Sequence, residues 1–376
     1  MPAPIYTYLV ADLRTNTILD ELPLTGVKFT KPLNDSGQLN ATWKLDTSNA
    51  TTRRNPYDLT MPARRCLYAL RDGHPIWGGI IWTRRYTSTE QTVSIGAGEF
   101  WSYFDHRKVL PVLTSTAIDH IASRTVSYTN TEQNQIARNL VALAQSHTGG
   151  DILIETDSTS TGIFRDRTYH GHELREVGDT LRQLCNVLSG PDMAFDVAPG
   201  TGIAPRRVLR LGTPRLGQQG SAHVWESGGN VLDYVWPSDA TRMTTRAYAA
   251  GEGVDLGIPI AYHEDTSRYD AGYPLLESER TYTGVVVEQT LRDHAEADQT
   301  ATRLPVALPV LTLRGDTPPT AAEVTRGDDG RVLLGPDLFF PHRIDTTMRV
   351  IDITIAPGDD AERLELTMAP LLDDVA

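Results

Sequence analysis

Residues 65–104 constrain the fold more than any other part of the chain, because three strand patterns follow one another there. Leu67–Leu70 and Ile76–Tyr86 flank Asp72-Gly73, a dipeptide that accepts positive φ at both central positions of a type I′ hairpin turn. The third pattern, Thr92–Ala97, follows a polar turn and alternates apolar with small polar residues. The stretch predicts a three-stranded antiparallel meander, closed by the aromatic residues that follow it.

Strand periodicity also predicts which side chains share a face, because residues two apart point the same way. In the second strand of the meander we expect two faces, Ile80, Trp82, Arg84 and Tyr86 on one and Ile81, Thr83 and Arg85 on the other. The end of the chain predicts a second hairpin around the Pro357–Asp360 turn. Its inward side chains are expected to be Ile351, Ile353, Ile355, Leu364, Leu366 and Met368.

Between these hairpins the pattern changes to helical spacing. Asn130 with Gln133 matches the N-cap and N3 positions of a helix. A second apolar stripe, from Leu174 to Leu188, predicts a helix over 173–188 that ends before Gly190-Pro191.

Strand patterns flank this middle segment on both sides, so we expect three domains. The fold class is mainly β with an α+β insertion: a first tube-like β domain over 1–110, an inserted α/β domain over 111–235, and a second tube-like β domain over 236–376. Within the last domain we expect an extended loop over 251–274 and a bracing helix over 291–304, which Pro305 ends.

Composition excludes several classes of protein. The net charge of −13 argues against a nucleic-acid grip, which needs clustered cations, although DNA could slide past an acidic wall. Two cysteines, Cys66 and Cys185, are too few for a disulfide scaffold or a Cys-based zinc site. The N-terminus lacks a basic region before an apolar run, and no stretch approaches the length of a membrane span. We therefore expect synthesis in a cytoplasm and no membrane-spanning segment.

Catalytic motifs are equally scarce. The chain has no G-x-S-x-G elbow, P-loop or H-E-x-x-H helix. His170, His172 and Glu173 are the best metal candidates, but a further ligand at recognisable spacing is missing, and a polar loop is the preferred interpretation. The paired carboxylates at 328–329, 359–360 and 373–374 predict solvated turns or a polar terminus. The two Arg-Gly-Asp tripeptides at 314–316 and 326–328 predict turns.

One family resemblance accounts for these patterns together. An apolar strand with Trp77-Gly78-Gly79-Ile80-Ile81-Trp82, a polar turn, a second strand and an aromatic cluster resembles minor tail proteins, or baseplate hub proteins, of long-tailed bacteriophages. The resemblance covers most of the chain and is weakest around 148–172 and 251–275. It implies homotrimeric rings of tube-like β-domains at the tail tip, within the virion.

From this resemblance we expect a structural hub that links the tail tube to the tip, without enzymatic activity or cofactor. Its expected partners are other copies of the chain, a distal tail or tube protein, the tape measure, and tip or fibre proteins. The residues expected to carry assembly are Trp77, Trp82, Val93, Ile95, Ile351, Ile353, Leu364 and Leu366. Two alternatives stay open: a carbohydrate- or receptor-binding tail protein that uses the middle segment, and a cell-wall-degrading tail enzyme built around His170, His172 and Glu173.

Overall fold

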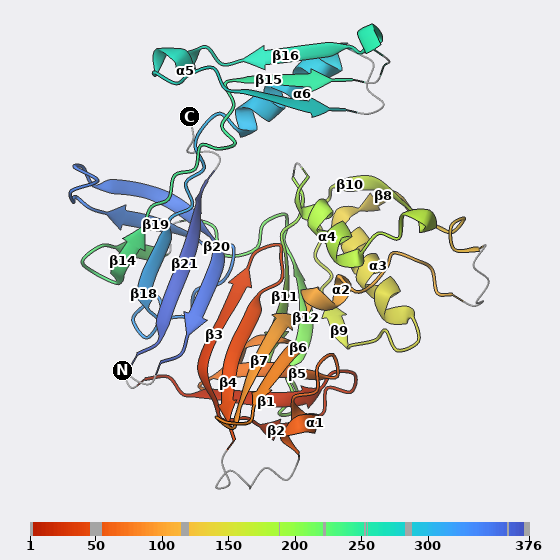
Figure 1. Ribbon diagram of the computed structural model, residues 1–376, viewed down its shortest axis with the longest axis vertical. Helices are drawn as coiled ribbons and strands as arrows, with labels where there is room; N and C mark the ends of the chain where they lie inside the picture. Colours follow the sequence, from red (N-terminus) through yellow and green to blue (C-terminus); the bar gives the residue numbers. More distant parts are fainter. Residues whose placement is uncertain are drawn as a thin grey trace. The chain divides into compact units, whose positions relative to one another are not determined.

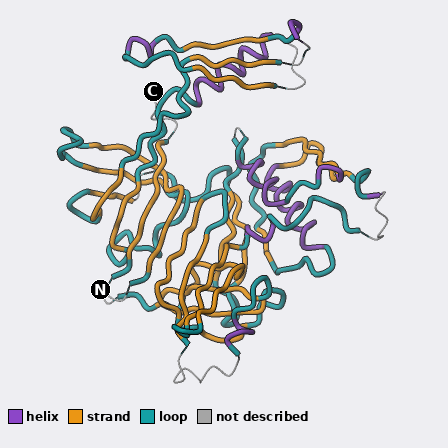
Figure 2. Tube along the Cα trace, in the orientation of Figure 1, coloured by secondary structure: helices purple, strands orange, loops and turns teal. Residues whose placement is uncertain are grey.

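The structure is a computed structural model. It describes residues 3–45, 55–113, 120–187, 189–220, 223–251, 253, 255–282, 288–358 and 361–371. The chain forms two compact units: unit 1 is Met1–Tyr234 with Val310–Ala376, and unit 2 is Val235–Pro309 (Figure 1). Strands predominate over helices (Figure 2), so the predicted mainly-β class is confirmed.

Unit 1 is organised around one sheet of thirteen strands in the described residues. The strands are β1 (Tyr6–Asp12), β2 (Ile18–Glu21), β3 (Leu24–Pro32), β4 (Gln38–Lys44), β5 (Arg65–Arg71), β6 (His74–Thr87), β7 (Thr92–Glu99), β13 (His223–Glu226), β14 (Val231–Val235), β18 (Val310–Arg314), β19 (Asp329–Leu334), β20 (Ile344–Ala356) and β21 (Arg363–Pro370). Their order is β14-β18-β21-β20-β3-β4-β7-β6-β5-β1-β2. Outside this order, β19 pairs with β20, and β13 pairs with β19.

Strands from the two ends of the chain meet inside this sheet. β3 pairs antiparallel with β20, so that Phe29 lies opposite Ile355 and Pro32 opposite Asp352. Residues 310–376 therefore belong to the same compact unit as residues 1–110. The predicted grouping of 236–376 as one domain is wrong, because backbone pairing with β3 makes the terminal strands part of unit 1.

The predicted meander is confirmed as β5, β6 and β7, each antiparallel to the next. Asp72 and Gly73 both have positive φ, 49° and 78°, as a type I′ turn requires. The closing aromatic residues begin at Phe100 and form the short helix α2 (Trp101–Phe104). Phe104 stacks on Phe195 with ring centroids 4.9 Å apart, so this cluster anchors the meander to the next part of the chain.

The predicted faces of β6 fail at a β-bulge. Ile81 pairs with Ala97 and Thr83 with Gly96, which leaves Trp82 as the extra residue. The bulge moves Arg84 to the face of Ile81. Side-chain alternation alone could not predict this shift, since an extra residue leaves no mark in the apolar pattern.

A second bulge changes the prediction for the last hairpin. Val350 pairs with Met368 and Asp352 with Thr367, so Ile351 is the extra residue and is only half-buried. The prediction that Ile351 points inward is wrong, and Val350 occupies the buried face instead. The inward positions of the other predicted residues are confirmed: Ile353, Ile355, Leu364, Leu366 and Met368.

Residues 120–220 contribute mixed α/β structure to unit 1. Its elements are β8 (Thr125–Glu132), α3 (Gln133–Ser146), β9 (Ile154–Thr156), β10 (Phe164–His170), η3 (Gly171–Glu173), α4 (Val177–Cys185), β11 (Met193–Ala198) and β12 (Arg206–Leu211); a further one-turn helix, α1 (Pro56–Leu59), precedes the meander. β8 pairs with β10, and β11 lies beside β12, which also pairs with β9.

Both predicted helices of this segment exist with shifted ends. Glu132, and not Asn130, caps α3, because residues 130–132 complete the strand β8. The second helix is shorter than 173–188: Leu174 adopts a left-handed φ of 47° before α4 and is 48% exposed. Leu188 lies outside the described residues.

The α/β segment shares one hydrophobic core with the first strands. Ile80 and Trp101 pack in the same cluster as Leu140 and Leu209. A buried cation crosses this seam: Arg207 donates hydrogen bonds of 2.6 Å to the carbonyl oxygens of Leu13 and Ile152 and to the Tyr68 hydroxyl. The segment over 111–235 is therefore not an independent domain, because its core is incomplete without the first strands.

Unit 2 is a small α/β unit of its own. It contains β15 (Arg246–Ala250), η4 (Asp255–Gly257), β16 (Ile260–Glu264), α5 (Ser267–Asp270), β17 (Glu277–Thr281) and α6 (Glu288–Ala301). Leu291 and Ala295 of α6 pack on Ala249 and Ala261 of the sheet β16-β15-β17. The predicted loop over 251–274 instead holds the strand β16 and the short helices η4 and α5, and α6 packs on this small sheet.

Among the residues that the structure describes, no helix combines the length and the apolar character needed to cross a membrane.

Candidate functional site

A polar face extends over seven neighbouring strands of the large sheet. Residues on one side of the sheet trace it from β18 to β6: Thr312, Glu365, Thr354, Thr30, Asn40, Gly96 and Thr83. Each lies opposite the next except Thr30 and Asn40, because the partner of Asn40 is Lys28, two residues before Thr30 on the same side. All of these positions are exposed or half-buried. Alternation explains this chemistry, because the intervening residues of β4 and β7 point into the core, among them Leu39, Trp43 and Ile95. We call this surface the polar face.

Ion pairing and close packing connect the strands of the polar face. Lys28 Nζ of β3 lies 3.3 Å from Glu365 Oε2 of β21, so the pair bridges over the strand β20 between them. At Gly96 a Cβ atom would lie 2.4 Å from Thr83 Oγ1, so a larger residue here would displace the Thr83 side chain. The face carries charges of both signs, among them the basic Lys28 and Arg85 and the acidic Glu365. It is therefore polar and not predominantly acidic.

The residues predicted to carry assembly lie mostly on the opposite, buried face. The buried ones are Trp77, Val93, Ile95, Ile353, Leu364 and Leu366. The half-buried Trp82 donates a hydrogen bond of 2.7 Å from its indole N–H to Ser102 Oγ, and the half-buried Ile351 is a bulge residue. In the described chain these side chains support the sheet from within, so any role in assembly is indirect.

A buried ionic cluster that was not predicted from the sequence joins three parts of unit 1: the first strands, the α/β segment and the C-terminal segment. Arg326 Nη2 lies 2.8 Å from both Glu99 Oε1 of β7 and Asp196 Oδ1 of β11, and Lys31 Nζ of β3 lies 3.9 Å from the same Asp196 oxygen. Arg326 also donates a hydrogen bond of 2.8 Å to the carbonyl oxygen of Pro32. We call Lys31, Glu99, Asp196 and Arg326 the junction network.

Burial and charge act in opposite directions on the carboxyl groups of the junction network. Burial raises the pKa of Glu99, and the neighbouring Arg326 guanidinium opposes that rise. At Asp196 burial also raises the pKa, but the charges of Arg326 and Lys31 outweigh it and hold the pKa at about 2. The network therefore works as a fixed clamp between β-strands that are distant in sequence.

The Arg-Gly-Asp tripeptide at 326–328 belongs to this clamp. Asp328 is 2% exposed and accepts 2.7 Å hydrogen bonds from the backbone N–H groups of Gln218 and Thr325. Asp329 is also 2% exposed and pairs with Arg215. The prediction of a solvated turn at Asp328-Asp329 is therefore wrong, and this tripeptide is inaccessible to an adhesion receptor.

The other polar pairs behave differently. Arg314 and Asp316 of the first tripeptide pair with each other at 3.0 Å, at the surface. The carboxylate pairs at 359–360 and 373–374 lie outside the described residues.

Two strands of the sheet present free edges. β5 pairs with β6 only as far as Ile80, so one edge of Thr83–Thr87 faces no strand in the described part of the chain. At the opposite end of the polar face, which is also one end of the sheet, β14 pairs with β18 alone among the named strands that the structure describes. Unpaired N–H and C=O groups along such edges readily accept another strand.

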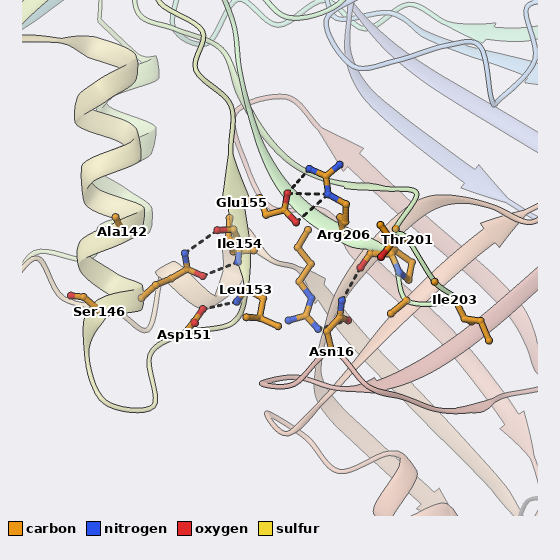
Figure 3. A pocket seen from close by; sticks show the side chains of 16 residues that line it. Asn16, Ala142, Ser146, Asp151, Leu153, Ile154, Glu155, Thr201, Ile203 and Arg206 are labelled. Atoms are coloured by element: carbon orange, nitrogen blue, oxygen red, sulfur yellow. Dashed lines mark hydrogen bonds and ion pairs between the residues drawn. The ribbon is translucent and has the colours of Figure 1, made fainter.

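A cleft of about 1050 Å³ lies in unit 1 between α3, the turn at Asn16 and the loop over 200–206 (Figure 3). Glu155 and Arg206 form an ion pair on its wall, and Leu153 and Ile203 expose apolar surface. No aromatic residue lines the cleft among the residues described. Stacking on a sugar ring, which the carbohydrate-binding alternative would require, has no platform here.

The predicted metal candidates do not form a binding cluster. The rings of His170 and His172 stack with centroids 5.4 Å apart. Glu173 is engaged by Arg175, whose Nε lies 3.0 Å from Oε2, and by the backbone N–H of His170. Within the described ranges, no group of three or more His, Cys, Asp or Glu side chains could hold a metal ion.

Comparison with known proteins gives a fold but no close relative. No protein-family model matches the chain, and no curated protein matches it significantly. The architecture described above, a mainly-β chain with a mixed α/β segment, is nevertheless the fold of bacteriophage tail proteins.

The solved structures that share this fold cover the whole chain at low identity. The 43 kDa tail protein of prophage MuSo2 from Shewanella oneidensis is 11% identical, with a TM-score of 0.61 over 97% of this chain and 98% of that one. A tail protein from Neisseria meningitidis is 12% identical, with a TM-score of 0.57 over 96% of each chain. A chain of the Francisella PdpA–VgrG complex is 10% identical, with a TM-score of 0.58 over 98% of this chain and 53% of that one.

Proposed function

We propose that this chain is a structural hub of a phage-like tail, which forms a ring at the distal end and links the tail tube to the tip. Three copies would each contribute two tube-like groups of strands, one from residues 1–110 and one from residues 310–376. Six similar groups would then match a six-fold tube above the ring. The chain works in this account by geometry and not by catalysis.

One observation carries the proposal: strands from both ends of the chain form a continuous sheet with a free edge at each end of its polar face. A ring satisfies both edges by the same contact repeated between copies, whereas an isolated chain leaves them open. The fold shared over nearly the whole chain with a prophage tail protein and with a tail protein from Neisseria meningitidis supports the same conclusion.

The polar face suits the inner wall of such a ring. Short hydroxyl and amide side chains, such as Thr354 and Asn40, offer a smooth hydrated surface without a strong field. DNA or a tape-measure protein could pass along it without being held. The net charge of −13 led us to expect an acidic lumen, past which DNA could slide. With the polar face as its wall, the proposed lumen would instead carry charges of both signs.

The proposed neighbours are a distal tail or tube protein above the ring, the tape measure inside it, and tip or fibre proteins below. The proposed location is the tail tip of the virion, reached by assembly in the host cytoplasm. No observation on the described residues favours a sugar-binding or cell-wall-degrading role. A stoichiometric metal found by elemental analysis of the purified protein would support the cell-wall-degrading role.

Solution mass tests the proposal. Mass photometry of the purified chain, alone and mixed with its tube protein, should give a species with three times the 41.4 kDa mass of the chain. A chain that stays monomeric in both conditions, up to micromolar concentrations, would contradict the ring.

A further inference from the structure

The tip of the β19–β20 hairpin presents two apolar side chains on a rigid turn. Leu338 is fully exposed and Phe339 is 75% exposed. Asp337 Oδ1 accepts hydrogen bonds of 2.8 Å from the backbone N–H groups of Phe339 and Phe340, and the Asp337 N–H donates one of 2.8 Å to the Phe340 carbonyl. We call Leu338 and Phe339 the knob, since the turn holds them in place before any partner arrives.

The knob belongs to one end of the large sheet. Behind it the Phe340 ring stacks on Tyr234 of β14, with centroids 6.3 Å apart, and the Tyr234 hydroxyl bonds to Asp337. The knob is thus fastened to the strand that ends the sheet. Rigid aromatic and aliphatic anchors of this kind are typical of the energetic centre of a protein interface.

The other free edge carries a pocket of matching chemistry. About 370 Å³ of space lies beside the C-terminal half of β6; the residues around it are Leu45, Asn55, Pro56, Tyr57, Thr60, Arg84, Tyr86 and Val93. The Arg84 guanidinium lies 3.9 Å above the centre of the Tyr57 ring and forms one wall. We call this the apolar pocket.

We infer that the knob of each copy inserts into the apolar pocket of the next copy around the ring. This inference rests on the proposed ring and names the contact that closes it. The knob lies at the β14 edge and the pocket at the β6 edge, so joining these two edges brings them to the same seam. A contact between two different surfaces of identical chains is head-to-tail. Repeating such a contact gives a closed ring when a whole number of copies completes one full turn.

Charge supports a second copy as the occupant. Beside the knob, Asp233 and Asp337 are exposed and acidic, and the wall of the pocket carries the basic, half-buried Arg84, with Lys44 and Arg85 on the adjoining polar face. Opposite charges at the rim favour the correct pairing of edges, and they oppose the pairing of two identical edges. One chain therefore supplies both halves of a complementary contact.

Cysteine pairs test the contact directly. In a Cys185→Ser background, Leu338→Cys chains mixed with Tyr86→Cys chains and oxidised with diamide should form a disulfide-linked dimer. Ile203→Cys is the matched control, because Ile203 is 76% exposed and lies away from both edges. Chains that carry both Leu338→Cys and Tyr86→Cys should give covalent species that stop at three chains. Cross-linking of Leu338→Cys no faster than that of the Ile203→Cys control would overturn the inference.

Charged substitutions give an independent measurement. Leu338→Asp with Phe339→Asp should weaken ring formation by about 30-fold or more, because two interface anchors are lost. Ile203→Asp should leave ring formation unchanged, and circular dichroism should show both variants folded. A ring that forms normally in the knob variant refutes the knob contact but leaves the hub intact. A wild-type chain that never assembles with its tube protein refutes the hub itself.

Discussion

Arg326 offers the sharpest test of how unit 1 is held together. Arg326→Met keeps the length of the side chain but removes the cation. Among the described residues, the backbone N–H of Gly37 is then the donor left to Glu99, whose side chain is 2% exposed. Removing one partner of a buried ion pair costs about 3–5 kcal/mol. For a unit of this size that loss lowers the Tm by about 10 °C, which differential scanning calorimetry at pH 7 resolves.

Two further variants separate burial from charge. Arg331→Met removes one partner of the exposed pair with Asp345 and should cost less than about 1 kcal/mol. Adding Glu99→Gln to Arg326→Met removes the stranded charge and should recover about 1–3 kcal/mol. If Arg326→Met lowers the Tm no more than Arg331→Met does, the junction network does not clamp the three parts of unit 1.

Three other outcomes follow from the structure. Because the pKa of Asp196 is held at about 2, its ionised form stabilises the fold above pH 4. As the pH falls from 4 to 2, the free energy of unfolding should therefore decrease by about 2 kcal/mol. Asp196→Asn should flatten that part of a plot of Tm against pH. Burial raises the pKa of both Cys66 and Cys185, so a thiol reagent at pH 8 should react slowly with the native chain. After unfolding in urea the reagent should modify both thiols. Rapid modification of the native chain would count against the burial of these thiols. Gly330→Ala places a Cβ atom 2.1 Å from the Trp225 ring and should cost about 1–3 kcal/mol in urea unfolding, whereas Gly202→Ala, with open space around it, should be nearly neutral.

Patterns within a few neighbouring residues were enough to predict single strands and turns, such as those of the meander. The Asp72-Gly73 turn and the alternation of Val93, Ile95 and Ala97 were sufficient for the meander. They failed at Trp82 and Ile351, where one extra residue per bulge reverses the faces without changing composition. β8 was missed because its sequence, TVSYTNTE, has only Val126 and Tyr128 as apolar residues on its inner face, which is a short alternation for a strand of this length.

Long-range pairing was beyond prediction from one sequence. Nothing in β3 indicates that β20 is its neighbour, so the terminal strands were assigned to a separate domain. The junction network has the same origin, since Glu99, Asp196 and Arg326 become neighbours only when three distant segments pack together. The exposed knob could have been noticed, because Leu338-Phe339-Phe340 is an apolar run between prolines, but sequence alone does not show that it is presented to solvent.

We propose that copies of this chain form a closed ring at the distal end of a tail. Electron microscopy of the parent particle tests it most directly, with a reconstruction of the tip at a resolution that separates strands. We predict three copies around the axis, with the polar face of Thr354 and Asn40 toward the channel and β14 of each copy beside β6 of the next. A tip that lacks this chain, or that holds it as single copies on the outside of the tube, would contradict the account.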